Sequence, residues 1–518
     1  LGDVPILRER LALSVAGLHV RRDGYTINDF TGNDVDTRNT FFGRGQLLWT
    51  PDARNEIRFS IHGERTRDGG FALSDLEGLR ARPLRIRQDF EGVTERDVIA
   101  PSITWTRTGG ALDLTSVTSF TRSDVLETSD FDFTTLDGIR RRTEEWLGAF
   151  TQEFRISPSA CAPPLRIGRC AEGRWLAGVF LYTSESARTA VNDYRPGGVG
   201  IISPVSGTDT SHGDFDDYGV SAFGQATATL FEKLEIGAGL RFDYESRRAA
   251  LARAFVSGGT TLTSTSERAS EEYAQLLPRF DAAWHCAPGI IVYGFAARGF
   301  KAGGFNLAAP VGRIAFAPET SWTFEGGAKA SLFDDRLQAS AACFYIDWDD
   351  MQLSQFDATV GGYVTNAGAA TSQGLEFELS ARPVGGLDVF TTFGYTDTEL
   401  TSYIDPYGVD VSGNNLPFAP ATTWSIGAQW SRCLGRGLRY HLRGEYLNVG
   451  PFYYDPGNLE KESYALANFR AGISGRWWRL EAWVRNAFDE SYVPVAFQPS
   501  PLDPSVFVGE SGAPRTYG

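Results

Sequence analysis

The sequence predicts an all-β protein and, within that class, a large antiparallel β-barrel that spans a membrane. Three observations lead to this prediction: the composition, a two-residue alternation of side-chain character, and a regular exchange of short and long connections. The chain of 518 residues contains 57 Gly and 13% aromatic residues but only one Met. Such a composition favours strands and turns over helices.

The alternation is clearest in residues 234–245, LEIGAGLRFDYE. Apolar side chains occupy the even positions there, and the odd positions carry charged residues and glycine, as a strand with one apolar face requires. Residues 374–380, 438–446 and 480–485 also alternate between apolar and charged positions. In a soluble sandwich the apolar face would be buried, whereas in a membrane barrel it faces lipid and the charged face lines a lumen.

The stretch 293–306, YGFAARGFKAGGFN, begins as such a strand and then becomes rich in glycine. We expect Tyr293, Phe295 and Ala297 to face lipid and Arg298 to face the lumen. The glycine-rich continuation is expected to leave the membrane as an external loop, with an aromatic residue near the membrane boundary.

Short connections alternate with long ones along the chain, which favours a membrane barrel over a sandwich. The short ones lie at 51–55, 107–111, 230–233, 333–336 and 383–386, and the long polar ones near 66–92, 188–216, 302–318, 402–417 and 452–462. Membrane barrels have short periplasmic turns and long extracellular loops. Counting segments between connections predicts about 20 strands, which is too many for an ordinary soluble sheet.

Other features exclude several classes of protein. No run of 18 apolar residues is present, so no transmembrane helix is expected, while a mean hydropathy of -0.22 is compatible with barrel strands. The net charge of -15 argues against a nucleic-acid partner. Residues 1–20 do not have the pattern of a signal peptide, so we expect either a cytosolic protein or a mature or trimmed sequence.

Catalysis is not expected. The five His are dispersed, and the sequence contains neither an HExxH motif nor a GxSxG nucleophile elbow. We therefore predict no enzyme, no catalytic residue, no metal site and no cofactor.

Several stretches together resemble the barrel of TonB-dependent outer-membrane receptors of the siderophore-receptor type. They are residues 21–26, 41–49, 151–157, 175–185, 276–280, 297–306, 318–329, 344–353, 366–379, 413–420, 486–492 and 512–518. The resemblance implies a barrel of about 22 strands, with residues 1–518 as the barrel domain and about 20 of its strands present. The plug domain, the first strands and the end of the last strand are expected to be missing.

The resemblance also implies a function and partners. Such a receptor lies in the bacterial outer membrane in contact with lipid and imports a large, scarce solute, most often a ferric siderophore. Iron would enter only as part of the transported chelate, and energy would come from the TonB complex through the missing N-terminal part. The alternatives are a passive porin-like channel, a receptor for a non-iron substrate such as an oligosaccharide, and a soluble all-β adhesion or carbohydrate-binding protein.

Aromatic residues near the expected outer ends of strands are the candidates for capturing a ligand, because rigid rings offer contact area at low entropy cost. Anchoring at the membrane interface is the alternative role for each ring. With their polar neighbours, the candidate ligand-binding residues are Phe131, Phe133, Arg298, Phe300, Lys301, Phe305, Asn306, Phe452, Tyr453 and Tyr454.

Cys161 and Cys170 bracket a short segment that the alternation of connections places on the periplasmic side. That compartment is oxidising, so we expect a disulfide between them. A metal site is the alternative, but it would lack two further ligands nearby.

Overall fold

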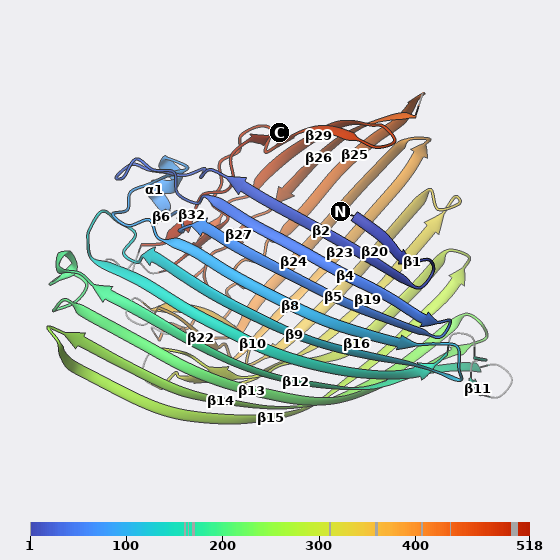
Figure 1. The fold of residues 1–518 in the computed structure, drawn as a ribbon, viewed down its shortest axis with the longest axis horizontal. Coiled ribbons are helices and arrows are strands. Elements are labelled where there is room, and N and C mark those ends of the chain that lie inside the picture. Colours follow the sequence, from blue (N-terminus) through green and yellow to red (C-terminus); the bar gives the residue numbers. More distant parts are fainter. Residues whose placement is uncertain are drawn as a thin grey trace.

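The computed structural model describes residues 2–159, 162–163, 165–167, 171–309, 312–357, 361–405, 408–435, 437–498 and 506–518. They form an antiparallel barrel-like sheet of 22 strands (Figure 1). Consecutive strands pair along it from β1 to β33, and β11 adds a short pairing to β12. The predicted fold class and the approximate number of strands are therefore confirmed.

The strands of the sheet are β1 (Gly2–Leu7), β2 (Leu11–Arg22), β4 (Arg38–Asp52), β5 (Asn55–Gly69), β8 (Val93–Arg107), β9 (Leu112–Asp130), β10 (Ile139–Pro158), β11 (Leu165–Ile167), β12 (Ala171–Tyr194), β13 (Gly207–Leu230), β14 (Leu234–Ser257), β15 (Thr260–Ala287), β16 (Ile290–Lys301), β19 (Glu319–Leu332), β20 (Leu337–Asp349), β23 (Ala369–Val384), β24 (Leu387–Ser402), β25 (Thr422–Gly435), β26 (Leu438–Val449), β29 (Tyr464–Ser474), β30 (Arg479–Arg485) and β33 (Thr516–Tyr517). The connections hold the remaining elements: β3 (Ile27–Asn28), β6 (Leu73–Asp75), α1 (Leu76–Ala81), β7 (Arg85–Ile86), η1 (Pro196–Gly198), β17 (Gly304–Phe305), β18 (Ala315–Phe316), β21 (Gln352–Asp357), β22 (Gly361–Asn366), β27 (Phe452–Tyr453), β28 (Glu460–Lys461), β31 (Val495–Phe497) and β32 (Val508–Glu510).

The two ends of the barrel differ, as the connection lengths predict. Tight turns such as those between β4 and β5, β13 and β14, and β23 and β24 lie at one end, which we call the turn end. The long connections lie at the other, which we call the loop end and which carries α1, β6, β22, β27 and β32 on the left of Figure 1. No helix within the described ranges is long and apolar enough to cross a membrane.

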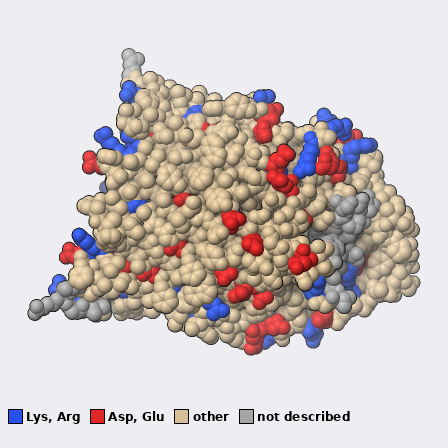
Figure 2. All heavy atoms as spheres, turned by 180° about the vertical axis from the view of Figure 1, so that it is seen from behind, with Lys and Arg blue, Asp and Glu red and all other residues tan. Residues whose placement is uncertain are grey.

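The predicted division into an apolar and a charged face is confirmed for residues 234–245. Ile236, Leu240 and Phe242 are between 46% and 49% exposed on one face, whereas Asp243 on the other face is 8% exposed. The charged face points inward, because loop residue Gly304 lies against Arg247 on that face of β14. Figure 2 shows a broad uncharged area, with Lys and Arg gathered mainly at its margins and Asp and Glu scattered toward the lower right.

The predicted orientation of residues 293–298 is wrong. Phe295 pairs with Asp281 on β15 and with Glu325 on β19, and Tyr293 donates a hydrogen bond to Glu325 (2.7 Å), so Tyr293 and Phe295 lie on the inward face. Arg298 is on the outward parity, opposite Trp322. Phe295 can lie on this polar face because a cation packs on its ring. The Arg279 guanidinium carbon is 4.7 Å from the Phe295 ring centroid.

Strands β12 to β15 extend well beyond the thickness of a membrane. Each contains 24 to 28 residues, whereas about 9–11 tilted residues are enough to span a bilayer. The long connection predicted near 188–216 is accordingly shorter, since β12 continues to Tyr194 and β13 begins at Gly207. Paired strands therefore form a tall wall at the loop end, and this wall carries the site described below.

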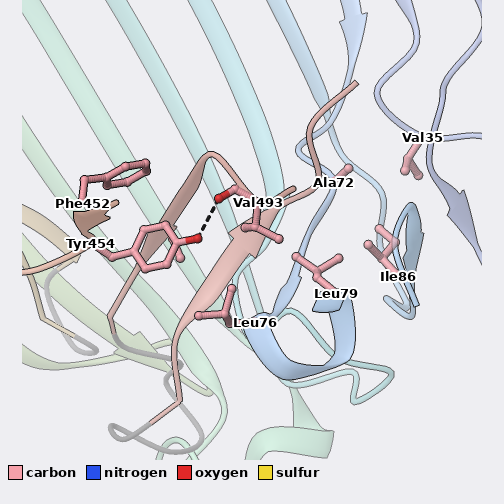
Figure 3. Packing of buried hydrophobic residues seen from close by; sticks show 9 residues of the cluster. Val35, Ala72, Leu76, Leu79, Ile86, Phe452, Tyr454 and Val493 are labelled. Atoms are coloured by element: carbon pink, nitrogen blue, oxygen red, sulfur yellow. Dashed lines mark hydrogen bonds between the residues drawn. The ribbon is translucent and has the colours of Figure 1, made fainter. Parts of the chain in front are cut away.

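The long connections pack into hydrophobic clusters at the loop end. We call the largest of them the cap core (Figure 3). It combines side chains from four connections: Val35, Ala72, Leu76, Leu79, Ile86, Phe452, Tyr454, Val493 and Ala496. Next to it in the sequence, β32 pairs with β6, so the connection before β33 is joined to the one that follows β5. The cap core thus ties the early part of the chain to the late part.

Candidate functional site

A cavity of about 490 Å³ lies at the loop end, between the inner wall of the barrel and two of the long connections. Its wall is built from β10, β12, β13 and β14. Direct pairing of Arg141 with Asn192, of Asn192 with Asp209, and of Ser211 with Arg253 places their side chains on the same inward face. A volume of this size suits a small-molecule ligand.

The roof of the cavity comes from connections far along the sequence. The β16–β19 connection contributes Phe305 and Phe316 from the small hairpin of β17 and β18, and the β20–β23 connection contributes Gln355 and Tyr363 from β21 and β22. The hairpin of β21 and β22 reaches the wall itself, because a Cβ added at Gly361 would collide with the Arg141 guanidinium. The two connections therefore fold across the mouth of the barrel.

Asn306 joins the two roof connections. Its side-chain amide donates to the carbonyls of Arg313 (2.8 Å) and Val364 (2.9 Å), and its side-chain oxygen accepts from the backbone N–H of Val364 (2.7 Å). The residue is 6% exposed. The structure thus gives Asn306 a role in holding the roof together.

We predict that Asn306→Ala loosens the roof. The substitution removes three hydrogen bonds from a buried position, and each contributes roughly 0.5–1.5 kcal/mol. Amide hydrogen exchange at Val364 should become at least tenfold faster. Asn306→Asp, which keeps the acceptor for the Val364 N–H, should have a smaller effect, and equal exchange in Asn306→Ala and the unsubstituted protein would contradict this role.

Among the described residues, the charged ones that line the cavity are three arginines and two carboxylates. Arg253 holds Asp209 through two hydrogen bonds, Nε to Oδ1 at 3.0 Å and Nη2 to Oδ2 at 2.6 Å. Arg188 lies farther from Glu145, at 3.6 Å between Nε and Oε2, and about half of each side chain is exposed. The cavity therefore has a local excess of positive charge in a chain whose net charge is -15.

Asn192 and Phe131 help to orient Arg141. Its Nε donates to the side-chain oxygen of Asn192 (2.8 Å), and its guanidinium carbon lies 3.9 Å from the ring centroid of Phe131. Phe131 is itself 5% exposed and packs with Phe133 and Ile139 in a hydrophobic cluster. This ring thus supports an arginine of the cavity from behind.

The structure brings together only part of the predicted set of ligand-binding residues. Phe305 and Asn306 line the cavity, and Phe131 touches its edge through Arg141. Phe300 packs near Tyr273, with ring centroids 6.5 Å apart, while Lys301 is exposed at the end of β16. Arg298 is on the outward face, as described above.

The remaining predicted aromatics pack elsewhere at the loop end. Phe133 lies in the cluster with Phe131, and Phe452 and Tyr454 belong to the cap core. Tyr454 donates to the carbonyl of Val493 (2.7 Å; Figure 3), and burial raises the pKa of Tyr454 to about 12. Tyr453 is half-buried beside Phe452. Four rings expected to be open to a ligand (Phe131, Phe133, Phe452 and Tyr454) are therefore buried, and direct ligand contact by the predicted residues stays a prediction.

Sequence reasoning missed Arg141, Glu145, Arg188, Asp209 and Arg253. They lie where the strands rise above the membrane, so no apolar alternation marks their inward face. Only the register of four strands brings them together.

Cys161 and Cys170 lie outside the described residues, so their disulfide stays a prediction. Among the described residues, no group of three or more His, Cys, Asp or Glu side chains is arranged to hold a metal ion.

Comparisons with known proteins agree with this architecture. Residues 12–487 match the family described as TonB dependent receptor-like, beta-barrel. The structure is similar to the ferric yersiniabactin uptake receptor FyuA from Yersinia pestis, with a TM-score of 0.84, 20% identity, and coverage of 99% of this chain and 75% of that one. It also resembles the siderophore receptor PiuA from Acinetobacter baumannii, with a TM-score of 0.77, 14% identity, and coverage of 100% of this chain and 78% of that one.

The match to a curated relative covers a shorter stretch. The metal-pseudopaline receptor CntO of Pseudomonas aeruginosa (strain UCBPP-PA14) is 30% identical over 125 residues, which are 24% of this chain and 17% of that receptor. The family match, in contrast, covers most of the chain. The protein therefore belongs to the TonB-dependent receptors, a family of outer-membrane β-barrels that are transporters and not enzymes.

Proposed function

We propose that this protein is a receptor that binds a metal chelate of the ferric-siderophore class at the outer face of the outer membrane and imports it with energy supplied through TonB. The observation that carries the proposal is the roofed cavity on the inner wall at the loop end, in a chain of this family. Its size suits a chelate rather than a bare ion. The metal is cargo, and no resident cofactor is needed.

Similar proteins support the class of substrate. Two of the three described above are named as receptors for a ferric or metal–ligand complex, and the third is named as a siderophore receptor. Long extracellular loops capture the chelate in this proposal, and the inner wall guides its passage.

Uptake of radiolabelled ferric chelates into cells tests the proposal. Cells that lack their own ferric-chelate receptors should accumulate at least one chelate when they express this protein, and accumulation should stop when the proton-motive force is collapsed or TonB is absent. Uptake that continues unchanged without energy would instead indicate a passive channel. Import of an oligosaccharide, with no import of any chelate, would contradict the proposed substrate class.

A further inference from the structure

The cavity at the loop end has a chemical preference beyond its size. Besides the arginines, its lining includes the side-chain amide nitrogen of Gln355, a buried donor with no hydrogen-bond partner among the described residues. A buried donor without an acceptor is costly. The cavity is therefore better matched to a ligand that brings acceptor oxygens than to one that brings donors.

The three arginines are held to different degrees. Arg253 is bidentate to a carboxylate that is 4% exposed, so this pair is a fixed part of the wall. Within the described part of the chain, the ion-pair partner of Arg188 is Glu145, through a long contact that water screens, and such exposed pairs contribute little. Its guanidinium can exchange Glu145 for an oxyanion of a ligand at small cost.

Arg141 lies on the same wall as Arg188, with the paired residues Thr143 and Ala190 between them on that face. The directly paired residues Glu145 and Arg188 lie on the inward face of β10 and β12, as do Arg141 and its partner Asn192. Arg141 is steered from its Nε side by Asn192 and from one face by Phe131. The two arginines thus belong to one surface of the cavity. Guanidinium groups bind carboxylates through paired hydrogen bonds, so this surface suits a carboxylate.

We propose that the transported chelate is anionic and that Arg188 and Arg141 bind one of its oxyanion groups, preferably a carboxylate. This inference rests on the proposed function and adds the charge class of the substrate. Glu145 acts as the internal competitor, because it occupies Arg188 when no ligand is bound.

Binding assays on the full chain in detergent micelles test this inference. The probes are ferric citrate, an anionic ferric tricatecholate and a neutral ferric trihydroxamate, each titrated by quenching of tryptophan fluorescence. The unsubstituted protein should bind at least one anionic chelate at least tenfold more tightly than the neutral one, and the preference should shrink as salt rises.

Three substitutions sharpen the test. Arg188→Gln should weaken binding of the anionic chelate about tenfold or more, as expected for loss of a charge-assisted hydrogen bond. Glu145→Gln should strengthen binding of the anionic chelate severalfold, because it releases Arg188. Misfolding of the variant cannot produce such a gain in affinity. The matched control is Arg142→Gln. Arg142 follows Arg141 on β10, points to the opposite face and pairs with Glu144. The affinity of this variant for the anionic chelate should stay within twofold of that of the unsubstituted protein.

The outcomes separate the two proposals. Tight binding of the neutral chelate with no response to Arg188→Gln would overturn the anionic inference and leave the receptor function standing. Stronger binding of an anionic chelate in Arg188→Gln together with weaker binding in Glu145→Gln would show that the site does not select negative charge and would overturn the inference as well. If none of the three chelates binds, the proposed function fails and the inference fails with it.

Discussion

Arg253→Met is expected to destabilise the tall wall of the barrel by about 3 kcal/mol, the low end of the cost of removing one partner of a buried ion pair, because the Arg253 side chain is 32% exposed. Asp209, which is 4% exposed, would keep its charge without the guanidinium that now donates to both of its oxygens. Because Asp209 and Arg253 lie on neighbouring strands β13 and β14, the loss should appear as faster amide exchange in residues 207–214 and 250–256. Hydrogen exchange on the protein in lipid vesicles measures it.

The double variant Asp209→Asn/Arg253→Met is the decisive control. It removes both charges, so it should recover most of the lost protection, since replacing a whole buried pair is often nearly neutral. Arg142→Met on the opposite face of β10 should change exchange little. If the double variant were as unstable as Arg253→Met alone, the effect would come from lost packing and the pair would not be the cause.

The sequence predicts the part of this fold that lies in the membrane, because lipid imposes a simple rule there. Every second side chain must be apolar over about ten residues, and the strand at 234–245 shows that rule on its outward face. The alternation of short and long connections is equally visible, since turns and loops differ in length as well as composition. Fold class and approximate strand number follow from these two signals.

The rule fails where both faces of a strand carry apolar residues. In residues 293–298 the aromatics Tyr293 and Phe295 look like a lipid face, yet they line the lumen beneath Lys329 and Arg279. Around these two rings the outward face of the strand carries Val292, Gly294 and Ala296, which give a weaker signal than two rings. The register with β19 decides the question, and one sequence does not contain that register.

The candidate site could not be predicted for a related reason. Its wall is formed by strands that continue above the membrane, where water meets both faces and no alternation is required. Segments such as 188–216 therefore look like a loop, although most of their residues are paired. Phe305 and Asn306, which line the cavity, could be predicted because they lie in a glycine-rich connection. Arg141, Arg188 and Arg253 have no such local signal in the sequence.

The cap core gives the second large expected effect. Leu79 lies on α1 and is 1% exposed within the cap core. Leu79→Ala should destabilise the cap by about 2–5 kcal/mol, since the surrounding side chains come from four separate connections and cannot all close on the space. Limited proteolysis of intact outer membranes, followed by mass spectrometry of the fragments, measures the opening of the cap.

The set of segments that become cleavable shows whether the connections open together or separately. Because β6 pairs with β32 and Tyr454 bonds to Val493, residues 70–92, 450–463 and 486–498 should become cleavable together in Leu79→Ala. Phe30→Ala, at a loop position that is 54% exposed, should leave the pattern unchanged. Cleavage confined to 70–92 would mean that each connection folds alone. Joint cleavage would mean that early and late connections form one cooperative unit, which holds the first and last strands of the sheet near each other at the loop end.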